Sequence, residues 1–177
     1  MLLKGSRLIT YAGVLVALGV GMVLISVYTP FGRRVLFLAS GVPLLTAAAV
    51  MGRRAALAVY GATVLLLFLW VNPFKATGYL LLAGGAPLAL ILTAGNVWLS
   101  GIFTLLLSLT YLWVSTALFG IQLAVLLASL ETWAPWVNPV MLGLGALTIL
   151  SFLYPWSLRW FDSELRGHWA FKEIFKP

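Results

Sequence analysis

The sequence predicts an all-α, polytopic integral membrane protein, a bundle of about six transmembrane helices followed by an amphipathic interfacial helix. Charged residues make up only 8% of the chain, whereas about a quarter of the residues in soluble domains are charged. Hydrophobic residues make up 63%, and the mean hydropathy is +1.08. Between Arg54 and Arg159 the only charged residues are Lys75 and Glu131. Such a stretch is typical of a chain that lies in lipid.

The apolar runs divide the chain into one transmembrane domain, residues 1–158, and a tail, residues 159–177. Each crossing needs roughly 20 apolar residues. The first run is too long for the core of a signal peptide, and no small-x-small cleavage site follows it. We therefore expect an uncleaved first helix. The predicted spans are about 8–28, 35–51, 55–71, 78–94, 97–120 and 140–158.

Two of the middle spans contain helix-breaking residues. Pro43 lies inside the second span, where neighbouring helices can satisfy the carbonyl that it frees. Gly84, Gly85 and Pro87 interrupt the fourth span, which predicts a kink or partial unwinding near Gly85. The fifth apolar run continues from residue 97 to residue 130, either as one bent helix or as two pieces that divide near residue 120.

The tail that follows the last span has an amphipathic pattern. Phe161, Leu165 and Trp169 recur at a spacing of four residues, and the charged side chains fall between them. Tyrosine and tryptophan side chains at residues 154–160 predict an aromatic belt at the level of the lipid headgroups. We expect the tail to lie along the cytoplasmic membrane surface. A frayed, charged tail is the alternative.

Lysine and arginine residues set the orientation of short-looped membrane proteins, because they concentrate on the cytoplasmic side. With six spans, eight of these residues share the side of the termini and three lie opposite, which predicts cytoplasmic termini in a bacterial inner membrane. A seventh span would move the basic residues of the C-terminal tail to the opposite side, so that most lysine and arginine residues would no longer lie on the side of the N-terminus. We expect the basic residues to meet anionic lipid headgroups and not nucleic acid. The set of eight is Lys4, Arg7, Arg53, Arg54, Arg159, Arg166, Lys172 and Lys176.

Small residues repeat every four positions in the first span, at Gly13, Ala17 and Gly21. Such a stripe lets the backbone of another helix approach closely. It predicts a contact with another membrane subunit. The alternative is that the stripe packs against a helix of the same chain.

A polar stripe follows the fifth span, at Ser100, Thr104 and Ser108, with Tyr111 nearby and Gln122 in the same apolar run. Side chains of this kind can line a cavity for a small-molecule ligand. They can also bond the carbonyl four residues earlier or a neighbouring helix. Both interpretations remain open at this point.

Glu131, Trp133, Trp136 and Asn138 lie together in the loop before the last span. An aromatic pocket with one carboxylate would suit a small ligand that is partly cationic or carries an amide. Alternatively, the tryptophans anchor the loop in the membrane interface and the carboxylate is solvated.

No Asp, Glu, His, Lys or Arg lies in the middle of a predicted span. This argues against a proton pump, an ion-coupled carrier and an intramembrane protease, each of which needs a buried ionisable group. The chain has no cysteine, and its single histidine, His168, lies in the tail. We therefore expect no enzymatic activity, no metal and no cofactor.

A longer segment carries a family resemblance. From Tyr28 the chain reads YTPFG, then an apolar run through SGVPLLTAAAVMGRRAALAVYGATVLLLFL, then NPFKATGYLLLAGG. Over roughly residues 8–120 it is similar to the YybS-like family of bacterial membrane proteins, in which a proline, an apolar run, a glycine and a basic residue lead into the third helix. That family resembles the S-components of energy-coupling-factor transporters and, more distantly, the rod-shape protein MreD.

The resemblance implies a six-helix, S-component-like, solute-binding subunit with cytoplasmic termini. Such subunits dock on a membrane coupling protein through an Ala-x-x-x-Ala pattern in the first helix, and later helices and outer loops hold the solute. Gly13, Ala17 and Gly21 match the spacing of that pattern but not its residue types. The chain departs from the family in being shorter, in lacking an evident vitamin-binding signature and in lacking the acidic residue expected of MreD.

The sequence thus leads us to expect a non-enzymatic membrane subunit of a larger complex. In one version it is a solute-binding subunit of an importer. In the other it is a structural or assembly subunit with no ligand of its own.

Overall fold

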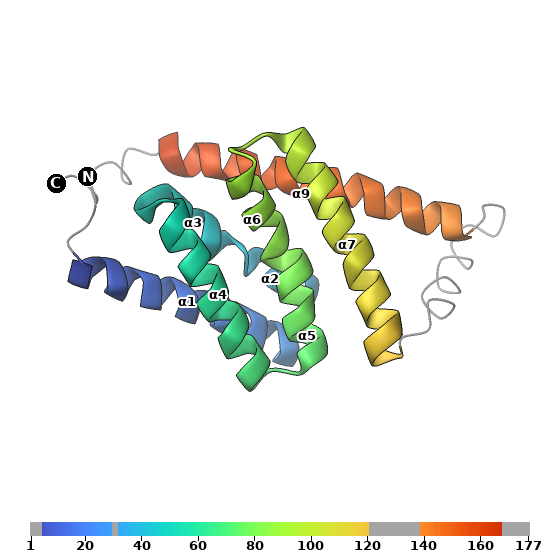
Figure 1. The fold of residues 1–177 in the computed structure, drawn as a ribbon, viewed down its shortest axis with the longest axis horizontal. Coiled ribbons are helices and arrows are strands. Elements are labelled where there is room, and N and C mark those ends of the chain that lie inside the picture. The colour runs from blue at the N-terminus through green and yellow to red at the C-terminus, as the bar shows by residue number, and fades with distance from the viewer. Residues whose placement is uncertain (1–4, 30–31, 121–138, 168–177) are drawn as a thin grey trace.

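The computed structural model describes residues 5–29, 32–120 and 139–167, and within these ranges every regular element is a helix. The all-α class is therefore confirmed for the described part of the chain. Figure 1 shows the elements in chain order. They are α1 (Gly5–Tyr28), α2 (Arg33–Ala39), α3 (Val42–Met51), α4 (Arg53–Trp70), α5 (Pro73–Gly78), the π-helix η1 (Tyr79–Ala83), α6 (Gly85–Leu92), α7 (Val97–Phe119) and α9 (Pro139–Gly167).

Six of the described helical segments are long and apolar enough to cross a membrane. The helices α1, α4, α7 and α9 each provide one of them. Two further segments are composite, because α2 and α3 together cover Arg33–Met51, while α5, η1 and α6 cover Pro73–Leu92. This number agrees with the predicted spans, and the limits of the first and fifth agree closely.

The last span is longer than predicted. The helix α9 does not end at residue 158 but continues past Pro155 to Gly167. No glycine or second proline interrupts residues 156–166, so nothing in the local sequence stops the helix there. The first part of the predicted tail is therefore continuous with the last span. Residues 168–177, and the predicted extension of the fifth span to residue 130, lie outside the described residues.

The fourth membrane-length segment lies at the centre of the bundle. Its most apolar window is 67% buried, whereas the windows of the other five are 11–39% buried. Figure 1 shows α5 and α6 between α4 and α7, with α9 crossing the bundle obliquely. Backbone groups that lose their partners where this segment is interrupted must therefore form hydrogen bonds with neighbouring helices.

Two clusters of buried apolar side chains hold the helices together. The larger cluster joins α1, α3, α4, α6 and α9. The smaller cluster joins α1 and α4 to α5 and η1. The fully buried members with the largest side chains are Leu44, Leu45, Leu67, Val23 and Tyr79.

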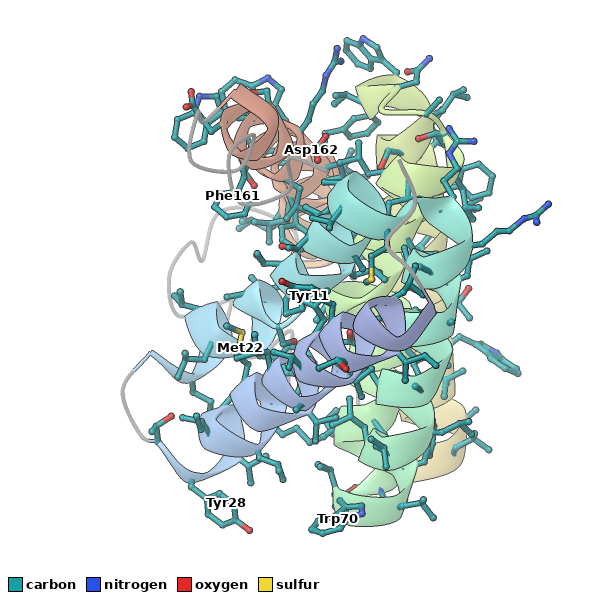
Figure 2. The ribbon with its side chains drawn as sticks, turned by 90° about the vertical axis from the view of Figure 1, so that its left-hand side faces the viewer. Tyr11, Met22, Tyr28, Trp70, Phe161 and Asp162 are labelled. Atoms are coloured by element: carbon teal, nitrogen blue, oxygen red, sulfur yellow. The ribbon has the colours of Figure 1, made fainter. Side chains whose placement is uncertain are left out.

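The bundle has two distinct ends. Tyr28 and Trp70 lie at one end, whereas Phe161 and Asp162 lie near the opposite end (Figure 2). Arg53 and Arg159 line one hollow together with Asp162, so they belong to that second end. We call it the arginine end.

Candidate functional site

The second and fourth spans are both interrupted, and the interruptions touch each other. Gly41 lies between α2 and α3, and a Cβ atom there would overlap the backbone oxygen of Ala83 and come 2.7 Å from the ring of Pro87. Glycine is therefore required for this close approach of two backbones. The unwinding expected near Gly85 is the π-helical turn η1 directly before it.

The π-helical turn changes the pairing of the backbone carbonyls. The N–H group of Gly84 donates to the oxygen of Tyr79, at 2.8 Å, and not to the oxygen of Leu80. The hydroxyl group of Tyr60, on α4, donates to the Leu80 oxygen at 2.7 Å. A side chain of a neighbouring helix thus satisfies a carbonyl that the π-helical turn leaves free, as a helix that crosses a membrane would require.

The hydroxyl group of Tyr154, on α9, lies beside two other carbonyl oxygens, which share its single hydrogen. Pro87 has no N–H group, so the oxygen of Ala83 lacks its α-helical donor. The hydroxyl group of Tyr154 lies 3.3 Å from that oxygen and donates to the oxygen of Leu38 at 2.8 Å. Sequence reasoning assigned Tyr154 to an aromatic belt and gave Tyr60 no role. The signal available was a tyrosine within an apolar run of a chain whose prolines free carbonyl groups.

The polar stripe of α7 lies in a helix interface. Ser100, Thr104 and Ser108 are all buried. The hydroxyl groups of Thr104 and Ser108 donate at 2.8 Å to the carbonyl oxygens of Ser100 and Thr104, respectively. Beside them Gly101 faces α9, where a Cβ atom would come 2.5 Å from a ring carbon of Phe152. For these two hydroxyl groups, the structure thus has the alternative in which the side chain bonds the carbonyl four residues earlier in its own helix.

Of the other predicted pocket residues, only Tyr111 lies in the described structure. It follows Ser108 by about one turn of α7 and lies roughly 16 Å along the helix from Ser100. Its ring lies 5.6 Å from that of Phe74, between centroids, so it packs against α5. The remaining predicted members fall outside the described residues and stay predictions. They are Gln122, Glu131, Trp133, Trp136 and Asn138.

The small-residue stripe of α1 faces away from the bundle. Gly13 and Ala17 are exposed, and Gly21 is half-buried. A Cβ atom added at Gly13 or Gly21 would meet no atom within 4 Å. The inward face of the helix is formed by other residues, which include Val16 and Val23. At these two glycines no described helix of the same chain occupies the space that the small side chains leave.

The arginine end collects several of the residues expected to set topology. Arg53 and Arg54 are exposed in the first turn of α4, and Arg159 is exposed on α9. Arg53 and Arg159 line a common hollow of about 550 Å³. Of the other predicted members, Lys4, Lys172 and Lys176 lie outside the described residues, as do the side chains of Arg7 and Arg166.

The chemistry of the described residues is that of packing and hydrogen bonding. Within the ranges that the structure covers, no group of three or more His, Cys, Asp or Glu side chains is placed to hold a metal ion. Comparison with protein families, with curated proteins and with solved structures finds no match for this chain.

Proposed function

We propose that this protein is a non-enzymatic, integral membrane subunit of a larger complex, which binds a partner helix through the outward face of α1. The observation that carries the proposal is the open space beside Gly13 and Gly21, with the exposed Ala17 between them. Lipid tails are as apolar as the side chains, so membrane helices associate where small residues let backbones approach closely. A stripe of this kind that faces away from its own bundle suits a helix of another polypeptide.

The inward face of α1 supports the same assignment. Val16 and Val23 belong to the two apolar clusters, and Gly19 faces Thr63 of α4, to which a Cβ atom would come within 3.3 Å. The helix is thus held in the bundle by a different set of residues. The outward stripe is therefore not needed for packing within the bundle. Substitutions in the stripe can test partner binding without changing the residues that hold α1 in place.

The membrane assignment follows the distribution of charge. We place the protein in the plasma membrane of a bacterium with both termini in the cytoplasm, because eight of the eleven lysine and arginine residues lie on that side of a six-span chain. The gathering of Arg53, Arg159 and Asp162 at one end supports this arrangement.

A second candidate is the S-component-like version, a solute-binding subunit of an importer. The interrupted second and fourth spans favour it, because many transporters hold their substrate at discontinuous helices near the middle of the membrane. Its ligand would be a small molecule with a cationic or amide group, bound near Glu131 and Asn138. In this version α1 docks on the coupling protein.

Replacement of Ala17 tests the contact on α1. The variant Ala17→Leu fills the stripe, and Leu65→Phe, which enlarges an exposed apolar side chain of α4, is the control. After purification in mild detergent, we expect Ala17→Leu to lose the co-purifying subunit and Leu65→Phe to keep it, as measured by mass spectrometry. Equal recovery of the subunit with both variants would remove the stripe from the argument.

The identity of the partner separates the two versions. A co-purifying ATPase together with a retained small molecule would favour the importer, whereas a stable complex without either would favour the structural subunit. A second copy of this chain is tested directly, because the chain has no cysteine. The variant Ala17→Cys would then form a disulfide-linked dimer under oxidation only if two α1 helices meet at the stripe.

A further inference from the structure

Three hollows follow one another from the arginine end, because each shares some lining residues with the next, and we call them together the track. The first is the hollow of about 550 Å³ beside Arg53 and Arg159. The second, of about 620 Å³, shares Arg159 and Gly95 with it and reaches Trp98 and Trp156. The third, of about 440 Å³, shares these two tryptophans and continues between α7 and α9. Each volume falls within the range of roughly 300–1,000 Å³ typical of ligand sites.

The track changes from charged to apolar along its length. Its first part carries two arginines against one aspartate, Asp162, which leaves a formal charge of +1 from 2 − 1. This part also borders the start of α4, where Gly52 provides no side-chain cap and the first turn holds no acidic residue. Its last part is lined almost wholly by apolar side chains of α7 and α9, such as Phe152 and Leu153.

Two tryptophans and an arginine mark the transition. Trp98 and Trp156 are 75% and 61% exposed, so neither is covered by the described protein. Arg159 lies one helical turn beyond Trp156, between the charged and the apolar parts. Tryptophan and arginine side chains prefer the boundary between hydrocarbon and headgroup, which places this point at the membrane interface.

We infer that the track binds one molecule of an anionic phospholipid. Its phosphate lies between Arg53 and Arg159, and one acyl chain lies in the groove between α7 and α9. The arginines supply charge complementarity, because a guanidinium group stays protonated and matches phosphate oxygens in pairs. A soluble phosphate would use the charged hollow but leave the apolar groove without an occupant. A phospholipid fills both the charged hollow and the apolar groove, because its charged headgroup is followed by apolar acyl chains in the same order.

Native mass spectrometry of the full chain in non-ionic detergent tests the headgroup. We expect it to retain phosphatidylglycerol in preference to phosphatidylcholine of the same acyl chains. Arg159→Gln should lower the retained phosphatidylglycerol about fivefold, the effect of one basic residue near anionic lipid. Arg54→Gln is the control, since Arg54 is an exposed arginine next to Arg53 in the first turn of α4 but does not line the hollow. Equal retention of both lipids, or equal effects of both variants, would overturn the proposal.

A second pair of variants tests the groove. Ile149 and Leu150 are neighbours on α9 with similar exposure, 60% and 62%, but of the two only Ile149 lines the groove. Ile149→Trp should reduce lipid retention, and Leu150→Trp should leave it unchanged, with circular dichroism checking that both fold. If the two behave alike while inorganic phosphate displaces the bound lipid, the site serves a soluble anion and the phospholipid assignment is wrong.

Discussion

At the scale of single residues, the hydroxyl group of Tyr154 holds together three segments that are far apart in the sequence. It donates to the carbonyl oxygen of Leu38 at 2.8 Å and lies 3.3 Å from that of Ala83, residues that are 116 and 71 positions earlier. Inside the hydrocarbon layer of a membrane, water cannot replace a lost donor. The loss of such a hydrogen bond would therefore cost more stability there than at a surface in contact with water.

Removal of this hydroxyl group should destabilise the bundle. We expect Tyr154→Phe to lower the free energy of unfolding by about 1–2 kcal/mol, because the carbonyl oxygens of Leu38 and Ala83 then lose the hydroxyl hydrogen that they share. Tyr28→Phe is the control, since Tyr28 is 81% exposed. Titration of mixed micelles with a denaturing detergent measures both values. Equal values for the two variants would show that the hydroxyl group of Tyr154 contributes nothing to stability.

At the scale of the elements, the two interrupted spans approach each other closely at their breaks. Gly41, at the break between α2 and α3, faces the end of η1. The break in one span thus accommodates the wide turn of the other. Neither segment would pack in this way as a regular α-helix, because a π-helical turn bulges outward from the helix axis.

A pair of glycine variants isolates this contact. Gly41→Ala should destabilise the bundle by about 1–3 kcal/mol, because its Cβ atom would overlap the backbone of Ala83 and force the two spans apart. Gly61→Ala, in the middle of α4, should be neutral or stabilise by about 0.5–1 kcal/mol, since a Cβ atom there meets nothing within 4 Å. The same unfolding titration compares them. A harmless Gly41→Ala would contradict the close approach of the backbones.

At the scale of the whole molecule, the bundle has two ends that the proposed orientation assigns to opposite sides of a membrane. Arg53, Arg159 and Asp162 line a hollow at one end. Tyr28 and Trp70 lie at the other (Figure 2). With cytoplasmic termini, the arginine end would face the cytoplasm and the end with Tyr28 would face the outside.

Single cysteines test the orientation, because the natural chain has none. We expect Tyr28→Cys to react with a membrane-impermeant maleimide in intact cells, and Arg54→Cys to react only after the cells are broken. Both side chains are exposed, so neither result depends on burial. The reverse pattern of labelling would place the termini outside the cell.

The number of membrane-length segments, and the limits of the first and fifth, could be predicted because they depend on local composition. A span begins and ends where the run of apolar residues does, since charged side chains avoid the hydrocarbon layer. The interruption near Gly85 could be predicted for the same reason, because glycine and proline act on their own helix. The exception was α9, where Arg159 did not end the helix, because a charged residue marks a membrane boundary without breaking the backbone pattern.

The contacts between helices could not be predicted from the same information. The partners of Tyr60 and Tyr154 depend on which spans are neighbours and on how far each is rotated. The stripe at Ser100, Thr104 and Ser108 has a spacing that fits a cavity and an interface equally well, and only the positions of the neighbouring helices distinguish them. The outward direction of Gly13 likewise depends on the rotation of α1 as a whole.

The position of Tyr154 in the last span has a consequence for how the protein is made. A chain enters the membrane from its N-terminus, so the second and fourth spans are inserted before the last one. Tyr60 belongs to the third span and can bond Leu80 as soon as the fourth arrives. The hydroxyl group shared by the oxygens of Leu38 and Ala83 arrives only with Tyr154 of α9. On the proposed membrane assignment, insertion of α9 is therefore the step that supplies this donor to the earlier helices.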